Sequence, residues 1–219
     1  MKKTWLLFFV FVFVSATLSA QIKKGSIMLG LDFAFNGSSI KQEVNNNETK
    51  NSTTNFSASL LAGKAVKENL FFGAGVSYST TTFTPSGGQA AQKTNGFGGS
   101  VWGRKYFPIT GPLLAFVNGS IYVNTASNKN DNPNSYNTNA LGLGVALYPG
   151  LSLHVKKSFY LDASLNNLAN IYYTRTKVEQ SGGGSSNIQT SVNYGFSTSL
   201  GNDNNPLQLG IRWIIAGKK

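Results

Sequence analysis

The chain has 219 residues, of which 41% are hydrophobic, 12% aromatic and only 12% charged, whereas an average soluble domain carries about 25% charged residues. It has no Cys, which excludes disulfide scaffolds, thiol catalysis and Cys-ligated metals. The 19 basic and 8 acidic residues give a formal charge of +11. Such a charge would suit a nucleic-acid-binding protein, but the positions of the charges indicate another class.

Residues 1–20 have the pattern of a secretory signal peptide. Two lysines form a positive start, ten apolar residues follow, and small residues lead to a cleavage site after Ala20. Ten apolar residues are too few for a membrane-spanning helix, which needs about 20. We therefore expect cleavage and an exported domain of residues 21–219. Its 17 basic and 8 acidic residues give a formal charge of +9.

Beyond residue 20, bulky apolar residues alternate with small ones, with the period of two that is typical of strands with two different faces. The alternation covers eight segments. In the first four, the apolar face is formed by Ile27, Leu29, Leu31, Phe33 and Phe35, then Phe56, Ala58, Leu60 and Ala62, then Leu70, Phe72, Ala74, Val76 and Tyr78, then Phe97, Val101 and Phe107. In the last four it is formed by Leu113, Ala115, Val117, Ile121 and Val123, then Leu141, Leu143, Val145, Leu147, Leu151, Leu153 and Val155, then Phe159, Leu161, Ala163, Leu165, Ala169 and Ile171, and finally Leu207, Leu209, Ile211 and Trp213. The opposite face is rich in Gly, Ser and Asn.

The connectors between these segments alternate between long and short. Long polar connectors cover residues 36–53, 85–93, 126–135 and 177–187, and short links lie near residues 67–69, 108–112 and 156–158. This is the layout of an outer-membrane barrel, with short periplasmic turns, long external loops, apolar residues facing lipid and a polar lumen. The sequence therefore predicts an all-β fold, a closed antiparallel up-and-down transmembrane β-barrel of about eight strands.

A secreted soluble barrel that binds an apolar ligand, as lipocalins do, is the main alternative, because alternation alone does not say which face is wet. The small-residue face has almost no Lys or Glu, which suits a narrow packed lumen. Most apolar faces also extend over the roughly 9–11 residues that a membrane strand needs. A membrane barrel turns Leu29, Val76 and Val145 outward, whereas a lipocalin-like barrel turns them inward.

Five stretches of the sequence resemble a known family. They are Gly25-Ser26-Ile27-Met28-Leu29-Gly30, Asn69-Leu70-Phe71-Phe72-Gly73-Ala74-Gly75-Val76-Ser77-Tyr78, Arg104-Lys105-Tyr106-Phe107-Pro108, Phe159-Tyr160-Leu161-Asp162-Ala163-Ser164 and Leu207-Gln208-Leu209-Gly210-Ile211-Arg212-Trp213. In order and spacing they resemble the small outer-membrane β-barrel proteins of OmpA/OmpX type, especially the version widespread in Bacteroidota. The resemblance covers about the whole mature chain. It implies a fold and a location in a Gram-negative outer membrane, and no catalytic residues, because the family shares none.

The C-terminal part departs from the pattern of that family. Such barrels commonly end in an aromatic residue that the insertion machinery recognises, but here Ile-Ile-Ala-Gly-Lys-Lys follows Trp213. Residues 201–206 also interrupt the last strand. We interpret residues 191–213 as one long strand with a bulge, because a turn there would give an odd strand count.

Most basic residues of the mature chain are expected at the periplasmic end. Eleven of the 17 lie there, namely Lys23, Lys24, Lys64, Lys67, Arg104, Lys105, Lys156, Lys157, Arg212, Lys218 and Lys219. Exclusion of charge from the hydrocarbon explains this distribution, and a basic ring that faces phospholipid headgroups or an anionic polymer is the functional alternative. Nucleic-acid binding would need stacking aromatics beside the charges on an accessible surface, so nucleic acid is not an expected partner.

Four charged residues lie within strands on the inward face, namely Asp32, Arg104, Asp162 and Arg212. Closing the barrel places the last strand between the first and the seventh, so Arg212 could pair with Asp32 or Asp162. An eight-stranded barrel is just wide enough for its own side chains. We therefore expect this lumen charge network to be a structural plug, and a narrow gated pore is the alternative.

The sequence indicates no catalytic, cofactor or metal site. His154 is the only His, and its phase places it inward near a periplasmic turn, beside Ser152. A barrel enzyme acting on external lipid A with a Ser–His pair would need that pair at the opposite rim. Loss of activity in a His154→Ala variant would support this alternative.

We therefore expect a non-enzymatic outer-membrane barrel with a structural or surface-interaction role. Asn-rich loops at residues 36–53, 126–135 and 178–190 are expected to form the outer surface, where they could bind an external protein or glycan. None of these loops contains Trp, Phe or Tyr, so no ligand is indicated. The expected partners are outer-membrane lipid and the barrel assembly machinery, and the expected state is a monomer.

Overall fold

The computed structural model describes residues 22–44, 47–86, 91–128, 136–165, 168–182, 185–198 and 207–217. The regular elements in these residues are the strands β1 (Ile27–Val44), β2 (Asn47–Lys67), β3 (Leu70–Thr84), β4 (Gln92–Thr110), β5 (Leu113–Asn128), β6 (Tyr136–Lys156), β7 (Phe159–Leu165), β8 (Ala169–Gly182), β9 (Ser185–Thr198) and β10 (Leu207–Ile215). No helix in the described ranges has the length and hydropathy to span a bilayer. The predicted signal peptide lies outside the described residues.

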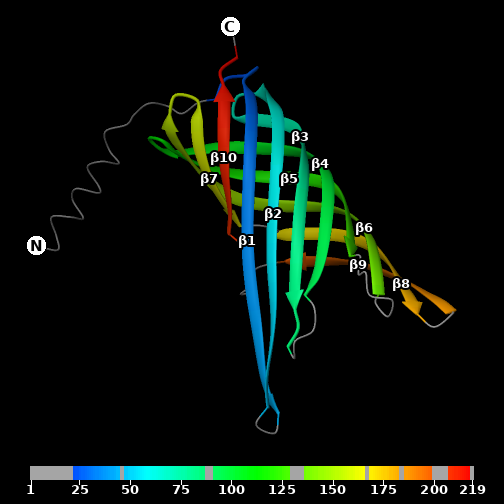
Figure 1. Ribbon diagram of the computed structural model, residues 1–219. Helices are drawn as coiled ribbons and strands as arrows, with labels where there is room; N and C mark the ends of the chain where they lie inside the picture. The colour runs from blue at the N-terminus through cyan, green and yellow to red at the C-terminus, as the bar shows by residue number, and fades with distance from the viewer. Residues whose placement is uncertain are drawn as a thin grey trace, which may run out of the picture.

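The strands form one antiparallel sheet that closes on itself. Successive strands pair from β1 to β7, β7 pairs with β10, and β10 pairs with β1. Eight strands therefore complete the ring at the end where β1 begins and β10 ends, which we call the terminal end (Figure 1). The predicted closed antiparallel barrel of eight strands is confirmed.

At two places in the ring, the wall is built from two separate strands, one near the terminal end and one farther from it. These are β7 and β8, and then β10 and β9. β7 pairs with residues Gly150 to Lys156 of β6, and β8 pairs with residues Tyr136 to Leu147 of the same strand. β9 pairs with β8 and is separate from β10. The predicted single strand over residues 191–213 is wrong, because the Gly, Asn, Asp and Pro of residues 201–206 have low strand propensity. Residues 199–206 lie outside the described part.

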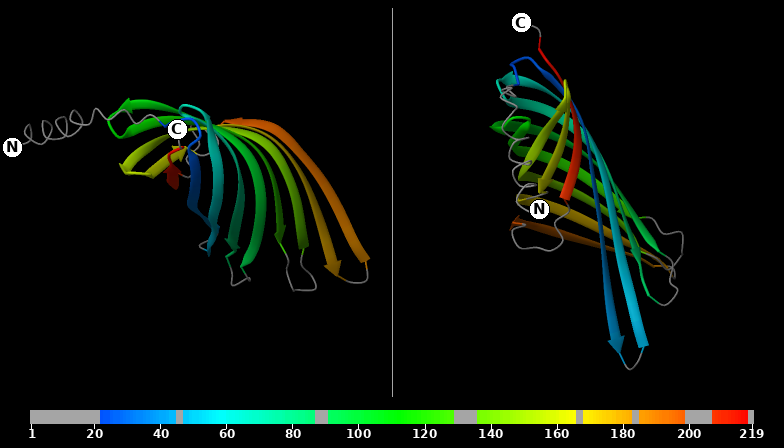
Figure 2. Two further views of the ribbon diagram at one scale, coloured as in Figure 1. Left: turned by 90° about the horizontal axis from the view of Figure 1, so that it is seen from above. Right: turned by 90° about the vertical axis from the view of Figure 1, so that its left-hand side faces the viewer.

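Away from the terminal end, the sheet opens out. The β1–β2 hairpin extends far beyond the ring, and the β8–β9 hairpin lies at the far side of the curved sheet (Figures 1 and 2). Within the described residues, β9 is paired on one edge only, and the β1–β10 ladder ends at Phe33.

Two of the predicted Asn-rich loops are wrong in their bounds. β1 continues to Val44 and β2 begins at Asn47, while β8 continues to Gly182 and β9 begins at Ser185, so most of residues 36–53 and 178–190 is strand. Both faces of these hairpins are polar in sequence, so hydrophobic alternation is lost while the backbone ladder continues. Of the third predicted loop, residues 126–128 belong to β5 and residues 129–135 lie outside the described part.

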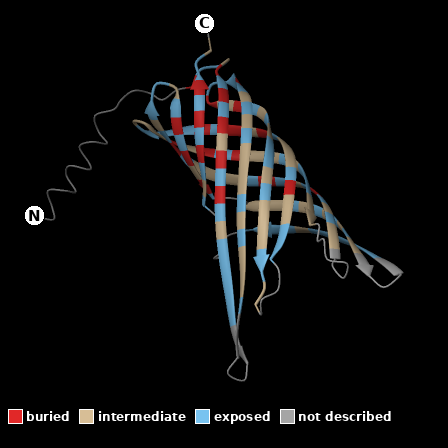
Figure 3. Cartoon of the chain, viewed as in Figure 1, coloured by how far each residue is buried: buried red, intermediate tan, exposed pale blue. Residues whose placement is uncertain are grey.

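The two faces of the sheet differ as the alternation predicts. Leu29, Val76 and Val145 point outward and are 49%, 62% and 49% exposed. Buried residues concentrate inside the barrel near the terminal end (Figure 3), where they form a packed core of Ile22, Met28, Ala65, Phe71, Trp102, Tyr106, Leu114, Phe116, Tyr160 and Ile214. The apolar residues predicted to face lipid therefore lie on the outside of a filled barrel.

A disulfide across the β1–β10 seam tests the closure directly. Leu31 pairs with Ile211, which pairs with Leu161 on the next strand. Directly opposed residues of antiparallel strands have Cα atoms about 4.5–5.5 Å apart, within disulfide range. We expect the L31C/I211C variant to cross-link on oxidation and to migrate differently from its reduced form after boiling. The L31C/L161C control spans two strands, about 10 Å, and should not cross-link; equal cross-linking in both would contradict this register.

Candidate functional site

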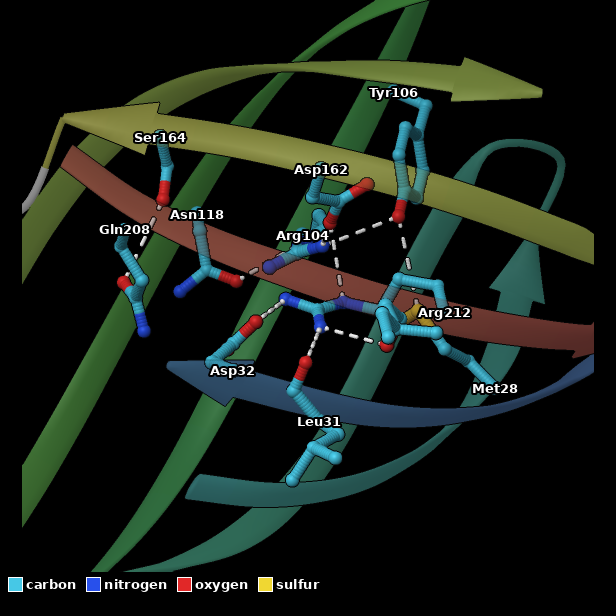
Figure 4. A network of polar contacts seen from close by, with 11 residues as sticks. Met28, Leu31, Asp32, Arg104, Tyr106, Asn118, Asp162, Ser164, Gln208 and Arg212 are labelled. Atoms are coloured by element: carbon cyan, nitrogen blue, oxygen red, sulfur yellow. Dashed lines mark hydrogen bonds and ion pairs between the residues drawn. The ribbon is translucent and has the colours of Figure 1, made fainter. Parts of the chain in front are cut away.

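The four charged residues predicted for the lumen meet in one network (Figure 4). Arg104 Nη1 lies 2.5 Å from Asp162 Oδ2, and Arg212 Nη2 lies 2.5 Å from Asp32 Oδ1. Arg212 Nε lies 3.1 Å from the same Asp162 oxygen. Arg212 thus contacts both carboxylates that the sequence offered as alternatives, and Asp162 links the two arginines. All four residues are at least 95% buried.

Arg104 crosses the lumen to reach this network. It comes from β4, and its partner Asp162 lies on β7, three positions away around the ring of eight strands. Its Nε donates to Asn118 Oδ1 at 3.1 Å, its Nη1 donates to the Tyr106 hydroxyl at 3.2 Å, and its guanidinium carbon lies 4.2 Å from the centroid of the Phe116 ring. These contacts fix the guanidinium across the width of the barrel.

Glycines on β1 and β10 make room for the Arg212 side chain. A Cβ at Gly30 would lie 2.9 Å from Arg212 Cδ, and a Cβ at Gly210 would contact the Asp32 carboxylate. Gly30 is the ladder partner of Arg212, and Gly210 is that of Asp32. Sequence reasoning missed these glycines, and their signal is a small inward residue directly opposite a charged one.

Bulky side chains pack in the lumen around the network: on β4, Trp102 lies two residues before Arg104, away from the terminal end, and Tyr106 lies two residues after it. The Trp102 indole lies against Gly63 and Gly73, where an added Cβ would come within 2.5 Å of the ring. Tyr106 packs edge-on against Phe71 and Phe116, with ring centroids 6.0 and 5.8 Å apart. Together with the charged network, these side chains form the packed part of the barrel interior.

Above the network, away from the terminal end, the lumen widens into a polar cavity of about 330 Å³. Its lining includes Ser59, Ser77, Ser100, Ser120, Tyr122 and Asn124. The inward residues change from bulky to hydroxyl-bearing along the same strands, so side-chain size alone creates this space. At the network, the cavity is bounded by Asp32 and by Trp102.

His154 does not form a Ser–His pair. Its Nε2 lies 2.6 Å from the Lys157 carbonyl oxygen, and its ring stacks on Tyr160 with centroids 4.5 Å apart. Ser152, its inward neighbour on β6, is buried and its Oγ has no hydrogen-bond partner in the described part of the chain. Nor do the described residues bring together three or more His, Asp or Glu side chains that could hold a metal ion.

No family model and no curated protein matches this sequence. Three solved structures are similar in outline. Neisserial surface protein A is 17% identical, with a TM-score of 0.41 over 86% of this chain and 96% of that one. The translocator domain of the autotransporter NalP from Neisseria meningitidis is 10% identical, with a TM-score of 0.37 over 96% of this chain and 95% of that one. The beta domain of the Bordetella autotransporter BrkA is 9% identical, with a TM-score of 0.30 over 89% of this chain and 99% of that one.

Proposed function

We propose that this protein is an integral outer-membrane β-barrel whose role is structural or surface-interactive. The observation that carries the proposal is the orientation of the wall. Large apolar side chains cover the outside of the barrel, with Leu60, Val76 and Ile121 each at least 60% exposed, while ion pairs lie within. Soluble proteins rarely expose apolar patches larger than a few hundred Å², whereas a membrane barrel requires such a belt. A lipocalin-like barrel would have the opposite orientation.

The charged network and the side chains packed around it support the role of a lumen plug. Two arginines and two aspartates balance in charge, and Arg104 joins β4 to β7 across the lumen. A pore would need a continuous water-filled path past these buried side chains. We therefore favour a plugged lumen over a narrow gated pore.

The remaining parts of the proposal depend on the sequence. An export signal at residues 1–20 fits a protein assembled by the barrel assembly machinery, and the resemblance to OmpA/OmpX-type barrels of Bacteroidota fits that location. The contacts of His154 favour a non-enzymatic barrel over a lipid-acting enzyme.

The polar β1–β2 and β8–β9 hairpins, which project away from the terminal end, are the surfaces for an external protein or glycan. The proposed state is a monomer without a cofactor.

Fractionation followed by a heat-modifiability gel tests this proposal. We expect the protein in the outer-membrane fraction, with a mobility in SDS that shifts on boiling, because a closed hydrogen-bonded barrel resists detergent until it is heated. Recovery from the periplasm or medium without a shift would overturn the membrane location. A search for an apolar ligand inside the barrel would then follow.

A further inference from the structure

A shallow groove interrupts the apolar outer wall over β4 and β5. Gly103 and Gly119 are ladder partners and both face outward, so two neighbouring positions lack side chains. Apolar side chains border this floor, namely Phe72, Val101, Val117, Ile121 and Val145. The ring of Phe72 leans over Gly103, where an added Cβ would lie 2.9 Å from it, but at Gly119 the nearest atom is Leu147 Cδ1 at 3.9 Å. The groove is therefore open above Gly119.

The groove has a cation at one end. Among the described residues, Lys105 is the one charged residue that lines it, and its ammonium lies at the terminal end, where Nζ donates to the Glu68 carbonyl oxygen at 3.1 Å. An ammonium group has three N–H donors, so two remain for another acceptor. Lys64 and Lys67 lie on β2, two strands from Lys105, and outnumber the single acidic residue of the β2–β3 turn, Glu68. This end of the groove is thus suited to an anionic group.

The length of the groove covers about two thirds of one leaflet of a bilayer. From Lys105, whose ladder partner Leu70 directly follows the β2–β3 turn, the groove continues to Val101, four residues or about 13 Å along the strand. Because barrel strands tilt by about 35–45°, this stretch covers about 10 Å of depth. The hydrocarbon core of a bilayer is about 30 Å thick, so the groove runs from the periplasmic interface toward the midplane. An apolar groove with a cation toward its interfacial end is complementary in shape and charge to the acyl chain and phosphate of a phospholipid.

We propose that this groove binds one phospholipid of the periplasmic leaflet, with an acyl chain over Gly119 and the phosphate at Lys105. The inference depends on the proposed function, because it requires the outer wall to face lipid. The bound lipid would fill the depression that the two glycines create, and it would remain with the barrel when surrounding lipid exchanges.

Native mass spectrometry with phosphatidylglycerol as the probe tests this site. The Gly119→Leu substitution fills the groove from a position with open space, so the barrel is expected to fold normally. Gly99→Leu is the matched control, because Gly99 is also outward on β4 and the nearest atom to its added Cβ is at 3.9 Å. We expect G119L to weaken phosphatidylglycerol binding about tenfold, the equivalent of roughly two methylene contacts, and G99L to leave it unchanged. Lys105→Gln should weaken it as well, by loss of the phosphate contact.

Two results would overturn the phospholipid site while leaving the membrane location intact. One is equal binding to wild-type, G119L and G99L barrels that all show the heat-induced mobility shift. The other is a dimer of wild-type barrels that G119L dissociates, which would assign the groove to a second copy of the chain. Recovery of all variants as soluble protein without a mobility shift would instead overturn the proposed function itself.

Discussion

Replacing Asp162 with alanine is expected to lower the free energy of unfolding by about 3–5 kcal/mol, the usual cost of removing one partner from a buried ion pair. Asp162 contacts both arginines through one oxygen, so its loss leaves Arg104 and Arg212 buried with only Asp32 between them. The exposed Lys177–Glu179 pair, also 2.5 Å apart, provides the matched control. Because surface ion pairs contribute only about 0–1 kcal/mol, E179A should change stability little. Equilibrium unfolding in urea with refolded barrels measures both.

A double-mutant cycle separates the ion pair from the desolvation of its members. In R104M/D162A, the remaining Arg212 and Asp32 balance in charge, and replacing both partners of a buried pair with apolar groups is often close to neutral. We therefore expect R104M/D162A to be more stable than D162A alone. Equal loss of stability in D162A and E179A would show that the network does not stabilise the barrel.

The barrel wall was predictable from sequence because side chains along each strand alternate between the outer surface and the lumen. Leu29, Val76 and Val145 alternate with small inward residues, and that period of two survives in the structure as an outward apolar face. The same logic fails in the projecting hairpins. In residues 36–53 both faces of the hairpin are polar, so nothing in the pattern distinguishes a strand from a loop.

The charged network was predictable only in part. Arg212 and Asp32 lie on strands that must be neighbours once the ends of the chain meet, so their contact follows from closure alone. The contact of Arg104 with Asp162 depends instead on the stagger of the strands around the whole ring, which sets which residues of β4 and β7 lie at one level. Stagger cannot be deduced from alternation, and the sequence therefore identified Arg104 as a member without identifying its partner.

Glycines opposite large inward side chains carry some of the missing information. Gly30 faces Arg212 in the ladder, and Gly63 and Gly73 accommodate the Trp102 ring. In each case a small residue and a large one, one or two strands apart, occupy one level of the lumen. Because two large inward residues could not share that level, such complementary pairs restrict the strand registers that the sequence allows.

An arginine at Leu147 provides the sharpest test of which solvent surrounds the barrel. Leu147 lies near the middle of the outward apolar series of β6, which extends from Leu141 to Val155, and it is 45% exposed. In a bilayer, an outward arginine near the midplane costs about 2–4 kcal/mol, whereas near the interface it costs about 0–1 kcal/mol. We therefore expect L147R to destabilise the barrel by about 2–4 kcal/mol.

Val155 is the matched control, because it is outward on the same strand, 52% exposed and one residue from the end of β6. V155R should cost no more than about 1 kcal/mol when both variants are unfolded by denaturant from phospholipid vesicles. In a soluble barrel these positions would both face water, and an arginine would be tolerated equally at either. The difference between the two variants thus reports the depth of hydrocarbon around the wall, independently of how the lumen is filled. If L147R and V155R have the same stability as the wild type, the outward apolar belt does not lie in a membrane.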